Sequence, residues 1–161
     1  MLRIVIETNV DDVIDKYKQM KDDMNKKIDL FLERLATIGA QVASHEFATA
    51  VYNGVNDVVV SVMRVSETRW ELVANGKAVL FIEYGSGIKY GYGHPDPSIF
   101  GPSTWSESVG KGHWNDPKGW FWREGGELHH SYGNPPARAM YDATKEIELS
   151  IEEVAREVFV W

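Results

Sequence analysis

The densest group of glycines in the chain lies in EYGSGIKYGYGHPDP, residues 83–97, and glycine-rich loops can bind phosphate groups. The dinucleotide-binding pattern G-x-G-x-x-G is not met, because Tyr90 stands where a third glycine would follow Gly85 and Gly87. No Lys-Ser or Lys-Thr pair is present to make a P-loop. Both kinds of phosphate loop lead into a helix, which the alternating prolines of HPDP prevent. We therefore expect these glycines to form turns with positive φ.

Histidines suggest metal chemistry at three places. HEFAT, His45–Thr49, resembles the start of a zinc-protease helix, but Thr49 occupies the position of the second ligand. His129 and His130 are adjacent in a predicted strand, so their side chains point to opposite faces. Four residues of one predicted loop could gather around a divalent ion: His94, Asp96, His113 and Asp116. Their spacing matches no metal signature, and such residues are common in turns. We expect no metal site and no catalytic residue.

Large aromatic residues are concentrated in residues 105–122, namely Trp105, Trp114, Trp120, Phe121 and Trp122. Tryptophan is enriched where proteins dock, and its ring can also stack on sugars. These residues could instead pin a loop onto the sheet. We take Trp105, Trp114, Trp120 and Trp122 as candidate residues for docking a partner.

The composition argues against several functional classes. A formal net charge of −7 argues against a protein surface that binds nucleic acid, since such a surface is basic. The chain has no cysteine, which excludes disulfides, catalysis by a thiolate and zinc binding through cysteine. No segment approaches the length of a membrane-spanning helix, and MLRIVIE reaches Glu7 too soon for a secretory signal. We expect a single domain over residues 1–161 that needs no cofactor.

A long amphipathic helix is predicted after a first strand at Leu2–Glu7. Asn9 can cap this helix, and apolar residues then recur every three or four positions with one gap at Lys21. If it continued to about Val51, the helix would be ~60 Å long, which exceeds the width of a compact domain of this size. It must either break near Gly39 or project, leaving part of its apolar stripe for another subunit.

The middle of the chain predicts strands. One is expected at Val58–Val65, and two more in Arg69–Gly85 on either side of an Asn75-Gly76 turn, forming a three-stranded meander. Residues 86–118 lack a periodic apolar pattern and are expected to be a long loop insertion, either functional or disordered. A second hairpin is expected in residues 119–133, turning at Gly125-Gly126.

The last predicted element is a helix opened by Asn134 and Pro135, with an apolar stripe from Ala139 to Val158 and an acidic outer face. The predicted fold class is therefore α+β. A small, mainly antiparallel sheet would be packed by the long N-terminal helix and by this C-terminal helix.

Three short motifs follow one another along the chain. The first ends an apolar segment in Glu83, Tyr84, Gly85, Ser86 and Gly87. The second is Gly119, Trp120, Phe121 and Trp122, after the long loop. The third opens the last helix with Gly133, Pro135 or Pro136, Ala137 and Met140. Together they resemble the small head–tail joining, or minor tail component, family of long-tailed lambdoid-type phages and prophages.

The resemblance extends over essentially the whole chain in order. The family has Glu-aromatic-Gly-Thr-Gly in the first motif, where this chain has Ser86 for the threonine. In the third, Gly-x-Pro-Ala-x-Pro-aromatic-Met is usual, and Arg138 and Ala139 replace the second proline and the aromatic residue.

The resemblance implies a structural protein rather than an enzyme. Copies of the chain would form a ring at the head–tail junction of the virion, completing the tail or joining it to the head connector. Its partners would be other copies of itself, the head connector, and the tail terminator and tail-tube proteins. Assembly would take place in the host cytoplasm, and DNA would pass through an acidic lumen without sequence-specific binding.

Three alternatives remain open at the level of the sequence. The chain could be a tail terminator, which stops growth of the tail tube. It could be a carbohydrate-binding module whose tryptophans stack on cell-wall sugar. It could also be a metal-dependent hydrolase that uses the histidines and aspartates of the long loop.

Overall fold

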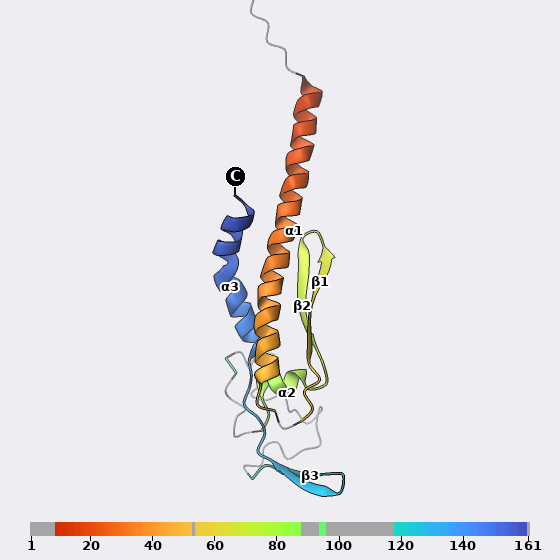
Figure 1. Cartoon of the computed structure of the whole chain (residues 1–161), viewed down its shortest axis with the longest axis vertical. Helices are drawn as coiled ribbons and strands as arrows, with labels where there is room; N and C mark the ends of the chain where they lie inside the picture. The colour runs from red at the N-terminus through yellow and green to blue at the C-terminus, as the bar shows by residue number, and fades with distance from the viewer. Residues whose placement is uncertain (1–8, 53, 88–93, 96–117, 161) are drawn as a thin grey trace, which may run out of the picture.

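The computed structural model describes residues 9–52, 54–87, 94–95 and 118–160, which form a long helical spine with elements on either side (Figure 1). The spine is α1 (Val10–Thr49). Along the C-terminal half of α1, α3 (Ala139–Val158) lies on one side, and the antiparallel hairpin of β1 (Val59–Ser66) and β2 (Arg69–Asn75) lies on the other. The predicted α+β class is confirmed.

Two smaller elements lie beyond the C-terminal end of α1. These are the short helix α2 (Val79–Tyr84) and a second antiparallel hairpin, formed by β3 (Trp120–Glu124) and β4 (Glu127–Ser131). The second hairpin turns at Gly125-Gly126, as predicted. The strand predicted at Leu2–Glu7 and most of the predicted loop at 86–118 lie outside the described residues.

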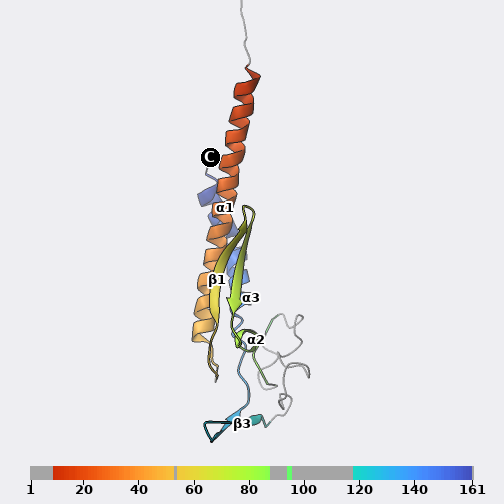
Figure 2. The same cartoon turned by 90° about the vertical axis from the view of Figure 1, so that its right-hand side faces the viewer.

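The helix α1 is continuous over 40 residues and therefore ~60 Å long. As predicted, Asn9 caps it: the Asn9 side chain accepts a hydrogen bond from the backbone N–H of Asp11 at 3.1 Å. The buried residues of α1 all lie in its C-terminal half, whereas every residue from Val10 to Lys21 is exposed. The sequence left two possibilities, a break in the helix or a projection of it. In the structure the helix is unbroken, and its N-terminal part projects beyond α3 and the first hairpin (Figure 2).

Gly39 does not break α1, because it is a point of close packing. A Cβ atom added to Gly39 would lie 2.5 Å from Cδ1 of Ile147 on α3 and 3.1 Å from Cδ2 of Leu72 on β2. The absence of a side chain therefore lets α3 and the hairpin approach the same turn of α1 from two sides.

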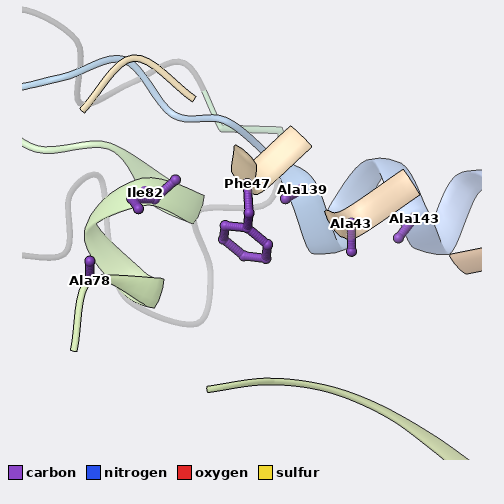
Figure 3. Packing of buried hydrophobic residues seen from close by; sticks show 6 residues of the cluster. All are labelled: Ala43, Phe47, Ala78, Ile82, Ala139 and Ala143. Atoms are coloured by element: carbon purple, nitrogen blue, oxygen red, sulfur yellow. The ribbon is translucent and has the colours of Figure 1, made fainter. Parts of the chain in front are cut away.

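The main core lies at the C-terminal end of α1, where four segments meet (Figure 3). Its fully buried members come from α1, from the start of α2 and from the start of α3: Ala43, Phe47, Ala78, Ile82, Ala139 and Ala143. Val60, Leu72 and Ala74 of the hairpin pack against this cluster. A smaller cluster between α1 and α3 contains Leu35, Val154 and Val158.

The predicted three-stranded meander is wrong. Residues 79–84, expected as the third strand, form α2, and the Asn75-Gly76 pair ends β2 rather than turning a hairpin. The reason lies partly with Asp57, whose carboxylate accepts hydrogen bonds from the backbone N–H groups of Lys77 and Ala78 at 2.9 and 3.0 Å. These bonds fix the turn at Lys77 and Ala78, immediately before α2 begins. A short apolar run such as VLFIEY does not by itself distinguish a buried strand from a buried helix.

The far end of the first hairpin is attached to α1 through Asp29. The Asp29 carboxylate accepts hydrogen bonds from Arg64 Nε at 2.8 Å and from Trp70 Nε1 at 2.9 Å. Arg64 and Trp70 are directly opposite each other in the β1–β2 ladder, so one carboxylate holds both strands. The Arg64 bond, followed by the Trp70 bond, lowers the pKa of Asp29 below its ordinary value of 3.8.

Replacing Gly39 with valine should destabilise the protein by about 2 kcal/mol, because the added side chain overpacks the contact with Ile147 and Leu72. The gain in helix propensity on replacing glycine is smaller, about 0.5 kcal/mol. Urea unfolding measures the difference. Gln41→Val is the matched control, since it places the same residue at an exposed position of α1. Equal stability of the two variants would contradict this account of Gly39.

The lowered pKa of Asp29 predicts a loss of stability in acid. Its interactions in the folded state stabilise the protein fully above pH 3.8, and this contribution disappears as the pH falls through the lower pKa of the folded state. Asp29→Asn should therefore reduce stability at pH 6, and should make the further loss between pH 6 and pH 3 smaller than in the unmodified chain. Urea unfolding at the two pH values measures this, and an identical acid loss in both proteins would refute it.

Candidate functional site

The segments that carry the first and third motifs, residues 81–87 and 133–140, lie against each other. Ser86 and Asn134 form an antiparallel bridge, in which each backbone N–H donates to the other residue's carbonyl, at 2.9 and 3.2 Å. Both residues are buried. The two motifs are therefore parts of one site.

The third motif caps the C-terminal end of α2. The last carbonyl groups of a helix have no partner within it. Here the carbonyl of Ile82 accepts from the backbone N–H of Ala137 at 2.8 Å, and that of Glu83 from the N–H of Arg138 at 3.1 Å. The carbonyl of Phe81 accepts from the side-chain amide of Asn134 at 2.8 Å.

The first motif in turn caps the N-terminal end of α3. Glu83 is 4% exposed, and its carboxylate accepts hydrogen bonds from the backbone N–H of Met140 at 2.8 Å and of Tyr141 at 3.1 Å. These are the second and third N–H groups of α3, the ones that a capping side chain normally binds. A carboxylate at this position is also favoured by the helix dipole. We call this two-way arrangement of α2 and α3 the reciprocal cap.

Glycines make the close approach of the two segments possible. Gly133 has a φ of 97°, and a Cβ on it would lie 1.8 Å from the carbonyl oxygen of Ser86. Gly85 has a φ of 75°, and a Cβ there would lie 2.8 Å from the carbonyl oxygen of Asn134. The prediction that Gly85 and Gly87 form turns with positive φ is confirmed.

The predicted start of the last helix is wrong, because α3 begins at Ala139 rather than at Pro135. Asn134 does not cap α3, since its backbone and side chain bind Ser86 and Phe81 instead. The residue at the N-cap position is Arg138, which has a φ of 61° and makes no capping bond through its side chain. The cap comes instead from Glu83, 57 residues earlier than Met140.

His94 is buried next to the reciprocal cap. Its Nε2 atom lies 3.2 Å from Oε1 of Glu83. Its ring lies 4.4 Å from the ring of Tyr84 and 5.6 Å from that of Tyr141, centroid to centroid. His94 therefore attaches the start of the predicted loop to both α2 and α3.

Of the four candidate docking residues, two lie within the described residues and two lie outside them. Trp105 and Trp114 lie outside the described residues. Trp120 and Trp122 belong to β3, opposite Ser131 and His129 of β4. The second motif therefore lies in a separate hairpin and not in the reciprocal cap.

Among the described residues, the other candidate residues are not gathered into a site. Within the described ranges there is no group of three or more His, Asp or Glu residues that could hold a metal ion. His45 and Thr49 lie at the end of α1, where the Thr49 hydroxyl donates to the His45 carbonyl. Asp96, His113 and Asp116 lie outside the description. The helices that the structure describes are all too short or too polar to cross a membrane.

Comparison of the chain with protein-family models, with curated proteins and with solved structures finds no match. The resemblance to the phage joining proteins therefore rests on the three motifs alone.

Replacing Glu83 with glutamine should destabilise the protein by about 2–3 kcal/mol. The neutral amide loses the charge-assisted hydrogen bonds to the partly buried N–H groups of Met140 and Tyr141, and its NH2 group would face one of these donors. Glu148→Gln is the control. It removes an exposed carboxylate of α3 that pairs with Lys145, and should change stability by less than about 0.5 kcal/mol. Urea unfolding followed by circular dichroism measures both. A Glu83→Gln variant as stable as the control would disprove the capping role.

Proposed function

We propose that this protein is a structural component of phage virion assembly, which forms a ring at the head–tail junction and completes the tail or joins it to the head connector. The observation that carries the proposal is the projecting half of α1, whose apolar stripe no other described element covers. The motif resemblance supplies the biological setting.

The stripe on the projecting half is continuous with the packed stripe of the same helix. Five apolar residues of this half are at least 45% exposed: Val10, Val13, Ile14, Tyr17 and Met20. An amphipathic helix normally buries its apolar face, and large exposed apolar surfaces mark sites of protein association. A ring of copies would provide the missing cover.

The reciprocal cap supports a structural role for the motif residues. Glu83, Gly85, Gly133, Ala137 and Met140 take part in the contacts that hold α2 and α3 together, either through hydrogen bonds or through close approach. Glu83 is directed at backbone N–H groups and is almost fully buried. Such residues would maintain the shape of a subunit rather than perform a reaction.

The charge of α3 fits a passage for DNA. This helix has six acidic and two basic residues, with Glu148, Glu152 and Glu153 exposed. We place this acidic side toward the lumen of the ring, where it would bind few phosphates and let DNA pass. A basic inner wall in the assembled ring would contradict this placement.

The proposal is tested by electron microscopy of lysates from a phage that lacks this gene, with the gene restored in trans as the control. DNA-filled heads beside free tails of normal length are expected. Abnormally long tails would instead identify a tail terminator. Intact virions in normal numbers would refute a role at the junction.

A further inference from the structure

A second apolar surface of this chain is exposed, on the outer side of the first hairpin. Alternate residues of a strand point to opposite faces. Val60, Leu72 and Ala74 face α1 and pack on the core. Val59 and Met63 are on the other face, Val65 lies in the irregularity of the ladder between Arg64 and Ser66 at the end of that face, and each of the three is at least 48% exposed.

The outer face includes residues of both strands. Val73 is opposite Ser61 in the ladder, and Glu71 is opposite Met63. We call this surface the outer hairpin face, formed by Val59, Ser61, Met63, Val65, Glu71 and Val73. An isolated two-stranded sheet is marginally stable, and this one is supported by α1 on its inner face.

The outer hairpin face and the projecting stripe of α1 match in size. The stripe from Val10 to Met24 is about 22 Å long at the rise of an α-helix. The segment of β1 from Val59 to Val65 is about 23 Å long at the rise of a strand. Either surface could therefore cover the other along its whole length.

The two surfaces also match in charge. Lys21 is the one charged residue that interrupts the apolar stripe, and it is exposed. Glu71 is the acidic residue on the outer hairpin face. Glu71 pairs with Arg69 at 2.5 Å, but such an exposed pair contributes little and can rearrange.

The fold already shows that this hairpin accepts this helix. The packed half of α1 covers the inner hairpin face through residues such as Ala43 and Phe47, which lie on a neighbouring side of the helix from the stripe of Phe31, Leu35 and Ile38 that packs on α3. The projecting half continues beyond Asp29, which contacts the far end of the hairpin, and points away from it (Figure 2). Because α1 is continuous, its projecting half cannot fold back onto the outer hairpin face of its own chain, so a projecting half that packs there must come from another copy.

We propose that the projecting half of α1, Val10–Met24, packs on the outer hairpin face of the next copy of the chain. The hairpin is then covered by a helix on each face, one from its own chain and one from its neighbour. Because the two surfaces differ, the contact is head-to-tail, and repetition of it gives a ring when the rotation between neighbours closes, as the proposed function requires. This inference rests on the proposed function, and names the contact by which the ring forms.

Pairing of two projecting stripes with each other is the competing arrangement. It would cover the helices and leave the outer hairpin face exposed on every subunit. The head-to-tail contact covers both surfaces at once, and is therefore favoured by the burial of apolar area.

The absence of cysteine makes disulfide trapping a clean test. Met20→Cys and Met63→Cys are prepared as single variants and as one double variant of the full chain. Both positions are exposed, and unchanged melting would verify folding. On mild oxidation, the mixed single variants should give a covalent dimer, and the double variant a ladder of dimers, trimers and larger species. Leu149→Cys, at an exposed position of α3, replaces Met20→Cys in the control mixture and should give no product.

Two results would overturn the contact. The first is that oxidised Met20→Cys alone gives as much covalent dimer as the mixture of Met20→Cys and Met63→Cys. Such a result would indicate that two projecting stripes pair with each other. The other is no product either in concentrated purified protein or in lysates of the phage that carries the double variant. A ladder from a protein whose loss leaves virions intact would retain the contact and reject the junction role. A joining defect in the phage without a ladder of cross-linked species would retain the junction role and reject the contact.

Discussion

The hydrogen bonds of the Glu83 carboxylate to the first turn of α3 are the contact on which the rest of the structure depends. The carboxylate belongs to α2, so the bonds fix α3 relative to α2 before any apolar packing is considered. The carbonyls at the end of α2 are bound in return by the segment that leads into α3. With both helix ends satisfied in this way, Ala139 and Ile82 are brought together on Phe47 of α1, and the main core is complete.

The core and the projecting surface divide α1 into two parts with different roles. From Leu35 to Phe47 the helix is the centre of the subunit, covered by α3 on one side and by the first hairpin on the other. Gly39 allows both neighbours to approach closely. From Val10 to Lys21 the same apolar pattern continues, and no element of the described residues covers it. One periodic sequence thus provides both part of the core and the exposed apolar surface on which the proposed contact with a second copy rests.

Much of this architecture could be predicted from local patterns. The stripe and the Asn9 cap indicate α1, and the pair Gly125-Gly126 indicates the second hairpin. The errors occurred where distant residues decide the local structure. Asp57 fixes the turn at Lys77 and Ala78 that leads into α2, and its effect cannot be read from the apolar run itself. Asn134 and Pro135 have the form of a helix start, yet Asn134 is bound to Ser86 and Phe81.

The candidate site was predictable in part. The glycines of the first motif indicate turns, and both motifs carry the resemblance to the phage joining proteins. That they bind each other was not predictable, because nothing in either segment specifies a partner 48 residues away. Glu83 gave the one available signal, as an acidic residue within an apolar segment that the core would bury. Such a residue must find donors, and the unpaired N–H groups at a helix start are a common source.

The unsupported half of α1 also has a consequence for the kinetics of assembly. Starting a helix is costly, but extending one is not, and the packed half already provides the nucleus. The free half therefore frays from its end in small steps, and exposed pairs such as Asp15–Lys18 and Asp23–Lys26 oppose this by only a few tenths of a kcal/mol each. A neighbour that binds the complete stripe must first restore the frayed turns, which weakens association between dilute subunits. Where many copies are held together on a template, the high effective concentration offsets this loss. In the proposed assembly, helix fraying would therefore slow the association of dilute subunits, and a template that holds many copies together would remove this obstacle.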